Sequence, residues 1–372
     1  MKIKALVLTV FLSFFYPLSL ISKFHKNRVT FISLEHDNLS KDFKLIYDKL
    51  VQEGKYEVKT LLFKFKPGLI GNIKYGLTCI RQIFALNNSR LIIIDYNNFV
   101  ISRFKHRKRV KILQIWHATG AIKKFGNSVS RDYKIQNYDY TIVASEFYQE
   151  VYSSSFNIPK NQISITGIPL NDQLFDLDFK KEAKEMLYER YPILQEKKVL
   201  TYAPTFRGRI SKQFKEIDIN FQWLKERLSE DYILIYKSHP LISNSRYAND
   251  PNILFIEEEL TSWLFCITDI LVTDYSALTI DWMIFDKPVI SFAPDFEKYN
   301  QAPGFVFNYL EEFPGPVCFN EEDLLKAIKQ PDLEKYKEKR QKFIEKTYQY
   351  KDGQSLNRVI NLINQIMNKN NN

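Results

Sequence analysis

Residues 116–126, WHATGAIKKFG, combine the residue types that a site for an anionic substrate needs. They directly follow an apolar run, residues 110–115, which we expect to form a buried strand. The imidazole of His117 can exchange a proton near neutral pH. The glycines let the backbone approach a ligand, and Lys123 and Lys124 attract phosphate. The competing interpretation is a packed Trp–His pair at the end of a strand.

Two further clusters follow predicted strands. Residues 202–209, YAPTFRGR, place a hydroxyl and two guanidinium groups on a turn, which suits a phosphate, although solvated loop arginines would look the same. Residues 237–240, KSHP, place His239 at a second strand end. Of the five histidines, only His117 and His239 have this setting, in different halves of the chain. A facing pair would suit proton transfer and phosphate contact, whereas two unrelated loop histidines are the alternative.

A fourth cluster lies at residues 273–281, TDYSALTID. Asp274 or Ser276 could cap the helix that follows, and the unpaired N–H groups of its first turn would form an anion site. Asp281, about one turn further on, could accept a hydrogen bond from a hydroxyl group of ribose or glycerol. Ordinary helix capping and a first-turn carboxylate would explain the same residues.

Strand-like and helix-like segments alternate along the chain, which predicts α/β domains with parallel sheets. The first series of strands is 29–34, 56–63, 90–95, 110–115, 140–144 and 162–166, with helices at 41–52, 69–85 and 146–155. The second series of strands is 198–202, 232–236, 253–256, 270–273 and 289–292, with helices at 179–191, 221–228, 277–285, 321–328, 333–346 and 354–369.

We therefore expect two doubly wound Rossmann-type domains, with the ligand in the crevice between them. The expected parts are a membrane-associating segment (1–28), an N-terminal domain (29–175), a C-terminal domain (176–350), and a helix with an Asn-rich tail (351–372).

Composition and the absence of several known motifs limit the classes of function that the sequence allows. The net charge of +10 favours a polyanionic partner. Three scattered cysteines without CxxC spacing argue against a disulfide framework or a zinc knuckle and fit a reducing cytosol. The chain has no P-loop, no GxGxxG and no HExxH motif, and the DLD at residues 176–178 matches a metal-binding DxD by chance.

The N-terminus predicts contact with a membrane. Residues 5–22 are mostly apolar and have basic residues on both sides. They fit a helix lying in the membrane interface, a spanning helix of marginal length that contains Pro17, or a signal peptide without an A-x-A-like cleavage site. With the basic run at residues 103–111, this segment favours lipid over nucleic acid as the anionic partner.

The clusters together resemble the CDP-glycerol glycerophosphotransferase family of teichoic acid synthesis in Gram-positive bacteria. The matching strings are QIWHATGAIKKFG (114–126), YAPTFRG (202–208), KSHP (237–240), VTDYSALTIDWMIFDKPVISFAPDFEKY (272–299) and FPGP (313–316). The resemblance implies a GT-B fold, transfer without a metal ion or cofactor, and peripheral attachment to the cytoplasmic face of the cell membrane.

At three places the chain differs from the family's polymerases, and these differences indicate which acceptor it uses. The family's polymerases usually carry HGTP where this chain has HATG at 117–120, and an arginine where Leu170 stands. Many also have an arginine at the position of Pro303. The pattern is closer to the family's primases, which add the first glycerol phosphate from CDP-glycerol to an undecaprenyl-diphosphate-linked N-acetylmannosaminyl-N-acetylglucosamine and release CMP. A glycerol or ribitol phosphate polymerase, a different GT-B glycosyltransferase and a non-enzymatic binding module are the alternatives.

The resemblance also implies roles for residues. His117 would be the general base, and His239 would stabilise charge on the departing phosphate. The expected substrate contacts are Thr119, Lys123, Lys124, Pro204, Thr205, Arg207, Lys237, Ser238, Asp274, Ser276, Ala277 and Asp281. The expected partners are CDP-glycerol, the lipid-linked disaccharide, an anionic membrane surface and other teichoic acid enzymes, with no nucleic acid.

Overall fold

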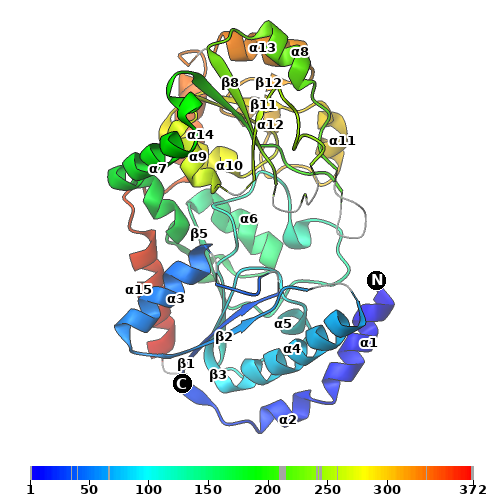
Figure 1. Ribbon diagram of the computed structural model, residues 1–372. Coiled ribbons are helices and arrows are strands. Elements are labelled where there is room, and N and C mark those ends of the chain that lie inside the picture. The colour runs from blue at the N-terminus through cyan, green and yellow to red at the C-terminus, as the bar shows by residue number, and fades with distance from the viewer. Residues whose placement is uncertain are drawn as a thin grey trace. The chain divides into compact units, whose positions relative to one another are not determined.

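The structure is a computed structural model, and it describes residues 2–34, 36–39, 41–65, 68–208, 215–239, 242, 245–257, 259–331 and 333–369. The chain divides into two compact units, each described by itself below (Figure 1). Unit 1 comprises residues 1–119, 125–172 and 348–372, and unit 2 comprises residues 120–124 and 173–347. The domain boundaries expected from the sequence were 175/176 and 350/351, and the helix that was expected as a separate C-terminal part belongs to unit 1.

Unit 1 contains a parallel sheet of six strands in the order β2-β1-β3-β4-β5-β6. The strands are β1 (His25–Ser33), β2 (Glu57–Leu62), β3 (Ser89–Ile94), β4 (Lys111–Gln114), β5 (Tyr140–Val143) and β6 (Ile163–Ile165). Every residue of β3 is buried. A strand that is covered on both faces is largely apolar, which is why residues 91–94 lack the alternation of a half-exposed strand. The buried Ser89 and Arg90 at its start are hydrogen-bonded.

Helices surround this sheet. They are α1 (Lys2–Ser13), α2 (Tyr16–Leu20), α3 (Lys41–Glu53), α4 (Leu69–Asn88), α5 (Phe99–Arg103), α6 (Glu146–Phe156) and α15 (Ser355–Asn368). Helix α3 buries Phe43, Ile46 and Leu50, which recur on one helical face, and it packs beside α15 in the main core of the unit (Figure 1). Helix α4 contacts β1, β2 and β3, and α1 and α2 pack against α4.

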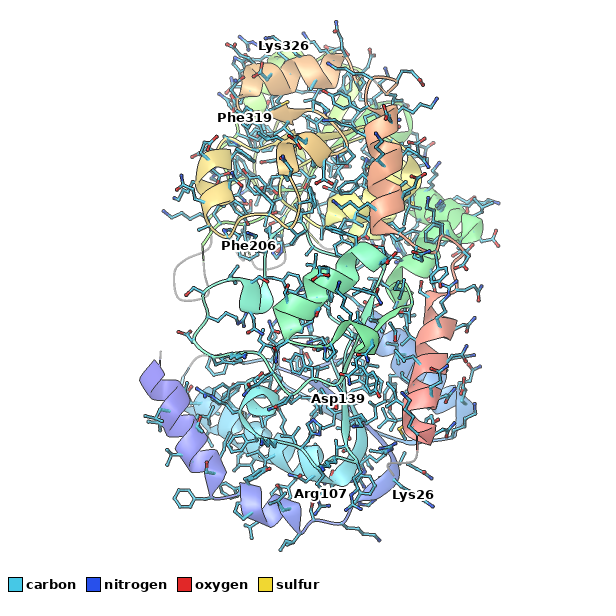
Figure 2. All side chains as sticks on the ribbon, turned by 180° about the vertical axis from the view of Figure 1, so that it is seen from behind. Lys26, Arg107, Asp139, Phe206, Phe319 and Lys326 are labelled. Carbon is cyan, nitrogen blue, oxygen red and sulfur yellow. The ribbon has the colours of Figure 1, made fainter. Side chains whose placement is uncertain are left out.

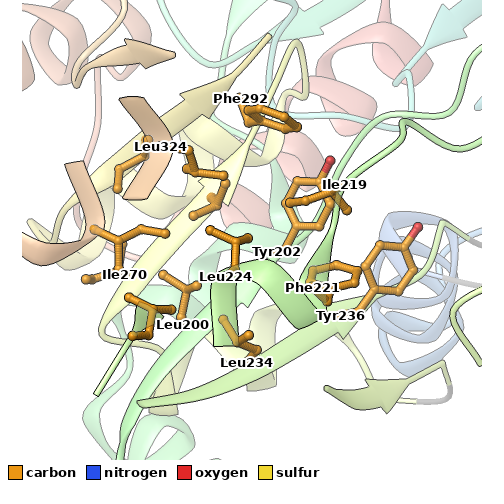
Figure 3. Packing of buried hydrophobic residues seen from close by; sticks show 14 of the residues in the cluster. Leu200, Tyr202, Ile219, Phe221, Leu224, Leu234, Tyr236, Ile270, Phe292 and Leu324 are labelled. Carbon is orange, nitrogen blue, oxygen red and sulfur yellow. The ribbon is translucent and has the colours of Figure 1, made fainter. Parts of the chain in front are cut away.

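Unit 2 contains a second parallel sheet, in the order β12-β11-β10-β7-β8-β9. Its strands are β7 (Lys198–Tyr202), β8 (Tyr232–Lys237), β9 (Leu254–Ile256), β10 (Ile270–Thr273), β11 (Val289–Phe292) and β12 (Val317–Cys318). Leu200, Leu234, Ile270 and Phe292 from four of these strands pack together in the core (Figure 3).

The helices of unit 2 are α7 (Leu177–Arg190), α8 (Phe221–Arg227), α9 (Thr261–Ile267), α10 (Leu278–Trp282), α11 (Phe296–Gln301), α12 (Tyr309–Glu312), α13 (Glu321–Lys329) and α14 (Lys337–Thr347). Asp176 is the N-cap of α7, and its side chain accepts hydrogen bonds from the backbone N–H groups of Asp178 and Phe179. This capping bond accounts for the first aspartate of the DLD sequence without a metal ion.

The prediction of two α/β domains with parallel sheets is confirmed. The two-residue strand β12 and the short helices α5, α9, α11 and α12 were not predicted. The apolar segment at residues 5–22 forms most of α1 and the whole of α2. Within the described ranges, no helix combines the length and the apolar character needed to cross a membrane.

Candidate functional site

His117 lies just beyond the carboxyl end of β4, and aromatic rings hold its imidazole. The ring of Tyr96 stacks on it at a centroid distance of 4.2 Å and an interplanar angle of 12°. The ring of Trp116 lies 4.0 Å away on centroids. Nδ1 of His117 is 3.3 Å from the backbone carbonyl oxygen of Asp95. Tyr96 and Asp95 come from the end of β3, the neighbour of β4 in the sheet.

Thr119 is held within unit 1. Its Oγ1 accepts a hydrogen bond of 2.6 Å from Nδ2 of Asn171, which also donates to the hydroxyl of Tyr348 at 2.7 Å. Thr119 is 3% exposed. This expected substrate contact therefore ties the His117 loop to the GIPLND sequence at residues 167–172.

The next residues, 120–124, belong to unit 2. Lys123 forms an antiparallel bridge with Phe305, and the backbone N–H of Lys124 donates to the carbonyl of Gly304 at 3.0 Å. Lys124 is exposed, whereas Lys123 is half-buried. Burial lowers the pKa of the Lys123 amine to about 8, with Asp274 opposing this shift and the charge of Arg207 adding to it.

Asp274 is the centre of the polar contacts in unit 2. It is fully buried directly after β10, and its Oδ1 accepts from the backbone N–H and the hydroxyl of Thr205 at 2.9 and 2.6 Å. Its Oδ2 lies 2.9 Å from Nη1 of Arg207. The hydroxyl of Tyr309 donates to its backbone carbonyl at 2.9 Å. Asp274 thus connects the end of β10 to the loop that follows β7.

The cluster after β8 contains two buried polar side chains. Nζ of Lys237 donates to the backbone carbonyl of Glu257, and burial lowers the pKa of this lysine. Ser238 is 2% exposed, and its hydroxyl has no hydrogen-bond partner among the described residues. The ring of His239 meets that of Phe206 edge-on at 4.6 Å. A buried hydroxyl without a protein partner is a candidate contact for a ligand.

The start of α10 differs from the sequence interpretation. Ala277 is the N-cap of α10, and it makes no side-chain capping bond. The carboxylate of Asp274 faces Thr205 instead, while Oγ of Ser276 accepts from the N–H of Leu278 at 3.3 Å. Of the two residues that the sequence offered as caps, Asp274 is therefore bound to Thr205, while Ser276 accepts from an N–H group of the first turn. Helix α10 also has only five residues.

The other expected site residues lie near these clusters. Asp281 is in α10 and partly exposed, and Pro204 is buried between β7 and Thr205. In unit 2, direct contacts join Thr205, Arg207 and Asp274, while Lys123 interacts with the last two through charge. His117 and Thr119 lie in unit 1. Arg209 and Pro240 are outside the described residues.

Several residues around the clusters were missed. They are Asp95, Tyr96 and Gln114 around His117, and Asp295 and Tyr299 around Arg207. Asp295 and Tyr299 lie in the quoted string 272–299, so the motif itself contained this signal. In the described part of the chain, no group of three or more His, Cys, Asp or Glu side chains could hold a metal ion.

Residues 14–365 match the family described as CDP-glycerol:poly(glycerophosphate) glycerophosphotransferase. The chain belongs to this family. It is 32% identical to the teichoic acid glycerol-phosphate primase of Bacillus subtilis, over 79% of this chain and 78% of that protein. It is 29% identical to the teichoic acid poly(ribitol-phosphate) polymerase of Bacillus spizizenii, over 94% of this chain but only 58% of that protein's length.

Solved structures agree with the fold. The wall teichoic acid polymerase TagF, in a variant soaked with CDPG, has a TM-score of 0.74 at 23% identity, covering 98% of this chain and 96% of that one. A protein of Listeria monocytogenes described as a putative UDP-N-acetylglucosamine 2-epimerase has a TM-score of 0.59 at 14% identity, covering 93% of this chain and 98% of that one. These similarities support the GT-B-like class expected from the sequence.

Proposed function

We propose that the chain is a teichoic acid glycerol-phosphate primase. It transfers glycerol phosphate from CDP-glycerol to undecaprenyl-diphosphate-linked N-acetylmannosaminyl-N-acetylglucosamine and releases CMP. Family membership and the identity to the Bacillus subtilis primase support the reaction class. The HATG sequence at residues 117–120, together with Leu170 and Pro303, supports a primase over a polymerase.

The setting of His117 is the observation that carries the transfer chemistry. A carbonyl oxygen accepts only from a protonated ring nitrogen, so the contact with Asp95 favours the tautomer with hydrogen on Nδ1. The lone pair is then on Nε2, where a general base needs it. We propose that Nε2 removes the proton from the attacking hydroxyl of the acceptor sugar.

Unit 2 is the proposed donor domain and unit 1 the proposed acceptor domain. The donor contacts would come from Thr205, Lys123, Ser238 and the start of α10, with the hydroxyl of Ser238 available as a buried partner. The ammonium of Lys123 has no hydrogen bond or ion pair with any residue that the structure describes. A half-buried cation that is attracted by the charge of Asp274 but makes no direct ion pair in the described part of unit 2 suits the diphosphate of CDP-glycerol.

The reaction proceeds by substitution at phosphorus. The acceptor oxygen forms a bond to the phosphorus next to glycerol, while the bond from that phosphorus to the bridging oxygen breaks. CMP leaves with the electron pair of the broken bond, and His117 retains the proton of the sugar hydroxyl. Lys123 and His239 would stabilise the charge that develops on the departing phosphate.

We also propose that the protein binds the cytoplasmic face of the cell membrane through unit 1. Helices α1, α2 and α4 pack against one another (Figure 1). Apolar side chains stay exposed on α1, on α2, in the turn after each of these helices, and on the first half of α4. They include Val7 (63%), Phe14 (74%), Ile21 (82%), Leu69 (78%), Ile70 (70%) and Ile73 (56%). A surface with this many exposed apolar residues is typical of a lipid or partner contact.

Basic residues border this apolar surface. Nη1 of Arg107 donates to the carbonyl oxygen of Ser22 at 3.1 Å, and the hydroxyl of Tyr16 donates to the carbonyl oxygen of Lys105 at 2.9 Å. Arg107 and Lys26 lie at the same end of unit 1 (Figure 2). The basic run at 103–111 thus flanks α2, and apolar residues with basic neighbours fit anionic headgroups better than nucleic acid.

Release of CMP from CDP-glycerol tests the proposal. The purified protein is given the lipid-linked disaccharide, or the same acceptor already bearing one glycerol phosphate. Faster CMP release with the bare disaccharide is expected. Preference for the primed acceptor would replace the primase assignment with a polymerase.

The donor needs a separate comparison. The chain is 29% identical to the teichoic acid ribitol-phosphate primase of Bacillus spizizenii over 94% of both chains. CDP-ribitol is therefore offered beside CDP-glycerol with the same acceptors. Faster turnover of CDP-ribitol would change the donor but retain the reaction class, and no CMP release with either donor would overturn the proposed function.

A further inference from the structure

Gln114, the last residue of β4, connects the two aromatic side chains that enclose His117. Its side chain is fully buried. Nε2 donates to the backbone carbonyl of Tyr96 at 3.2 Å, and Oε1 accepts from the backbone N–H of Trp116 at 2.7 Å. One amide group therefore holds the backbone of both residues whose rings contact the imidazole.

The backbone at Trp116 shows why this support is needed. Trp116 has a φ of 57°, a left-handed conformation that is costly for a bulky residue. Such a conformation persists only where surrounding contacts determine it. The hydrogen bond to Gln114 supplies one contact, and the packing of Trp116 on Phe125 and Phe156, at 5.1 and 5.2 Å between centroids, supplies others.

The second ring that contacts the imidazole depends on the same amide. Tyr96 stacks on His117 within 12° of parallel, and the preceding residue, Asp95, provides the carbonyl that faces Nδ1. Because Gln114 binds the carbonyl of Tyr96, it also limits how the Asp95–Tyr96 backbone can turn. Loss of this bond would free both the stacking ring and the carbonyl that selects the tautomer.

We propose that Gln114 and Tyr96 are positioning residues for the general base: together they fix the plane and the tautomer of His117. This inference rests on the proposed function, in which His117 removes the acceptor proton. Neither residue is required to touch the substrate. They act on catalysis through the orientation of the imidazole.

The test compares Gln114→Leu, which removes both amide contacts at similar volume, with Thr141→Val. Thr141 is fully buried in β5, and its hydroxyl donates to the backbone carbonyl of Gln114 at 2.8 Å. Thr141→Val therefore removes one buried hydrogen bond beside Gln114 but leaves its side-chain amide in place. It is the control for stability.

Gln114→Leu is expected to lower kcat by about 10- to 100-fold, the cost of a misplaced catalytic group, with the KM for CDP-glycerol within about twofold of wild type. Thr141→Val should keep kcat within about twofold although it also loses thermal stability, because it removes one buried hydrogen bond where Gln114→Leu removes two. Equal kcat for Gln114→Leu and Thr141→Val would overturn the proposal.

Tyr96 gives a second route if Gln114→Leu does not fold. Tyr96→Phe preserves the stacking ring and should retain most of the activity, whereas Tyr96→Leu should lower kcat. Spectra of ¹⁵N-histidine-labelled protein report the tautomer of His117 directly. One tautomer with hydrogen on Nδ1 is expected in wild type, and a mixture in Tyr96→Leu. If Tyr96→Leu has the same His117 tautomer and the same kcat as wild type, the positioning role is contradicted.

His117→Ala separates this inference from the function on which it rests. Its turnover should be lost, with CDP-glycerol binding largely intact. Retained turnover in His117→Ala would remove the general base and with it the proposed mechanism. An inactive His117→Ala beside a fully active Gln114→Leu and Tyr96→Leu would leave the function standing and contradict the positioning roles alone.

Discussion

Arg207 and Asp295 form a two-point ion pair in unit 2, with Nε 2.7 Å from Oδ2 and Nη2 2.9 Å from Oδ1. The third nitrogen, Nη1, donates to the carbonyl of Thr205 at 2.7 Å and lies 2.9 Å from Oδ2 of Asp274. Burial opposes the charge of Arg207, but the two carboxylates raise its pKa. All three guanidinium nitrogens thus have acceptors, so we propose that Arg207 orders the loop around Thr205 for the donor.

Arg207→Leu should destabilise unit 2. Removal of the guanidinium leaves the buried carboxylate of Asp274 without its cation, which typically costs about 3–5 kcal/mol. Urea unfolding of the full chain, followed by tryptophan fluorescence, measures the loss. Arg227→Leu is the matched control, because its ion pair with Glu226 is 43% and 57% exposed and is worth about 1 kcal/mol or less. Similar losses in the two variants would contradict the role of Arg207.

Lys123 predicts a pH dependence of donor binding. Burial lowers the pKa of its amine to about 8, so the ammonium is charged below this pH and neutral above it. The KM for CDP-glycerol should therefore rise as the pH increases through about 8. Lys123→Arg keeps the charge at every accessible pH and should remove this rise. The same rise in wild type and in Lys123→Arg would assign it to another group.

The apolar surface of unit 1 predicts binding to anionic vesicles. Ile70 and Ile73 are 70% and 56% exposed on α4, and they should insert below the headgroups with α1 and α2. The double variant Ile70→Asn, Ile73→Asn should lower the fraction that sediments with phosphatidylglycerol vesicles by at least about tenfold, since each buried isoleucine contributes about 1.5–3 kcal/mol. Leu177→Asn is the control, because Leu177 is an exposed leucine (78%) in unit 2. Equal sedimentation of all three proteins would refute the assignment of this surface.

The strands were predictable because a buried parallel strand contains a continuous apolar run, as residues 91–94 of β3 show. The two residues of β12 are too few to carry such a signal. His117 could be placed at a strand end from local sequence alone. Tyr96 could not be assigned to it, because their contact depends on β3 and β4 being neighbours, and local patterns do not contain the strand order.

The dependence of contacts on the fold also explains why the partner of Arg207 in unit 2 was missed. Arg207 and Asp295 are 88 residues apart, and each looks like a solvated loop residue in its own segment. The sequence offered a phosphate contact or a solvated loop arginine for Arg207 and did not predict its pairing with Asp295. The contact of Arg207 with a phosphate stays a prediction. A single residue at the end of a strand, such as His117, could be predicted from the sequence. A pair that the fold brings together, such as Arg207 and Asp295, could not.

Gly126, which ends the WHATGAIKKFG sequence, predicts a strong effect of one added methyl group. Its φ is 61°, and a Cβ at this position would lie 2.3 Å from the backbone carbonyl oxygen of Ser155. Gly54, which follows α3, has nearly the same φ of 64° but has nothing within 4 Å of an added Cβ. The two glycines therefore separate the cost of the left-handed backbone from the cost of the close approach.

Gly54→Ala should lower the free energy of unfolding by about 1–2 kcal/mol, the cost of a left-handed alanine. Gly126→Ala should lower it by about 1–3 kcal/mol more, because the backbone of α6 must move away from the methyl group. Urea unfolding of both variants provides the comparison, and kcat should fall in Gly126→Ala since its loop also carries His117. Equal destabilisation by the two substitutions would show that the contact with Ser155 relaxes without cost.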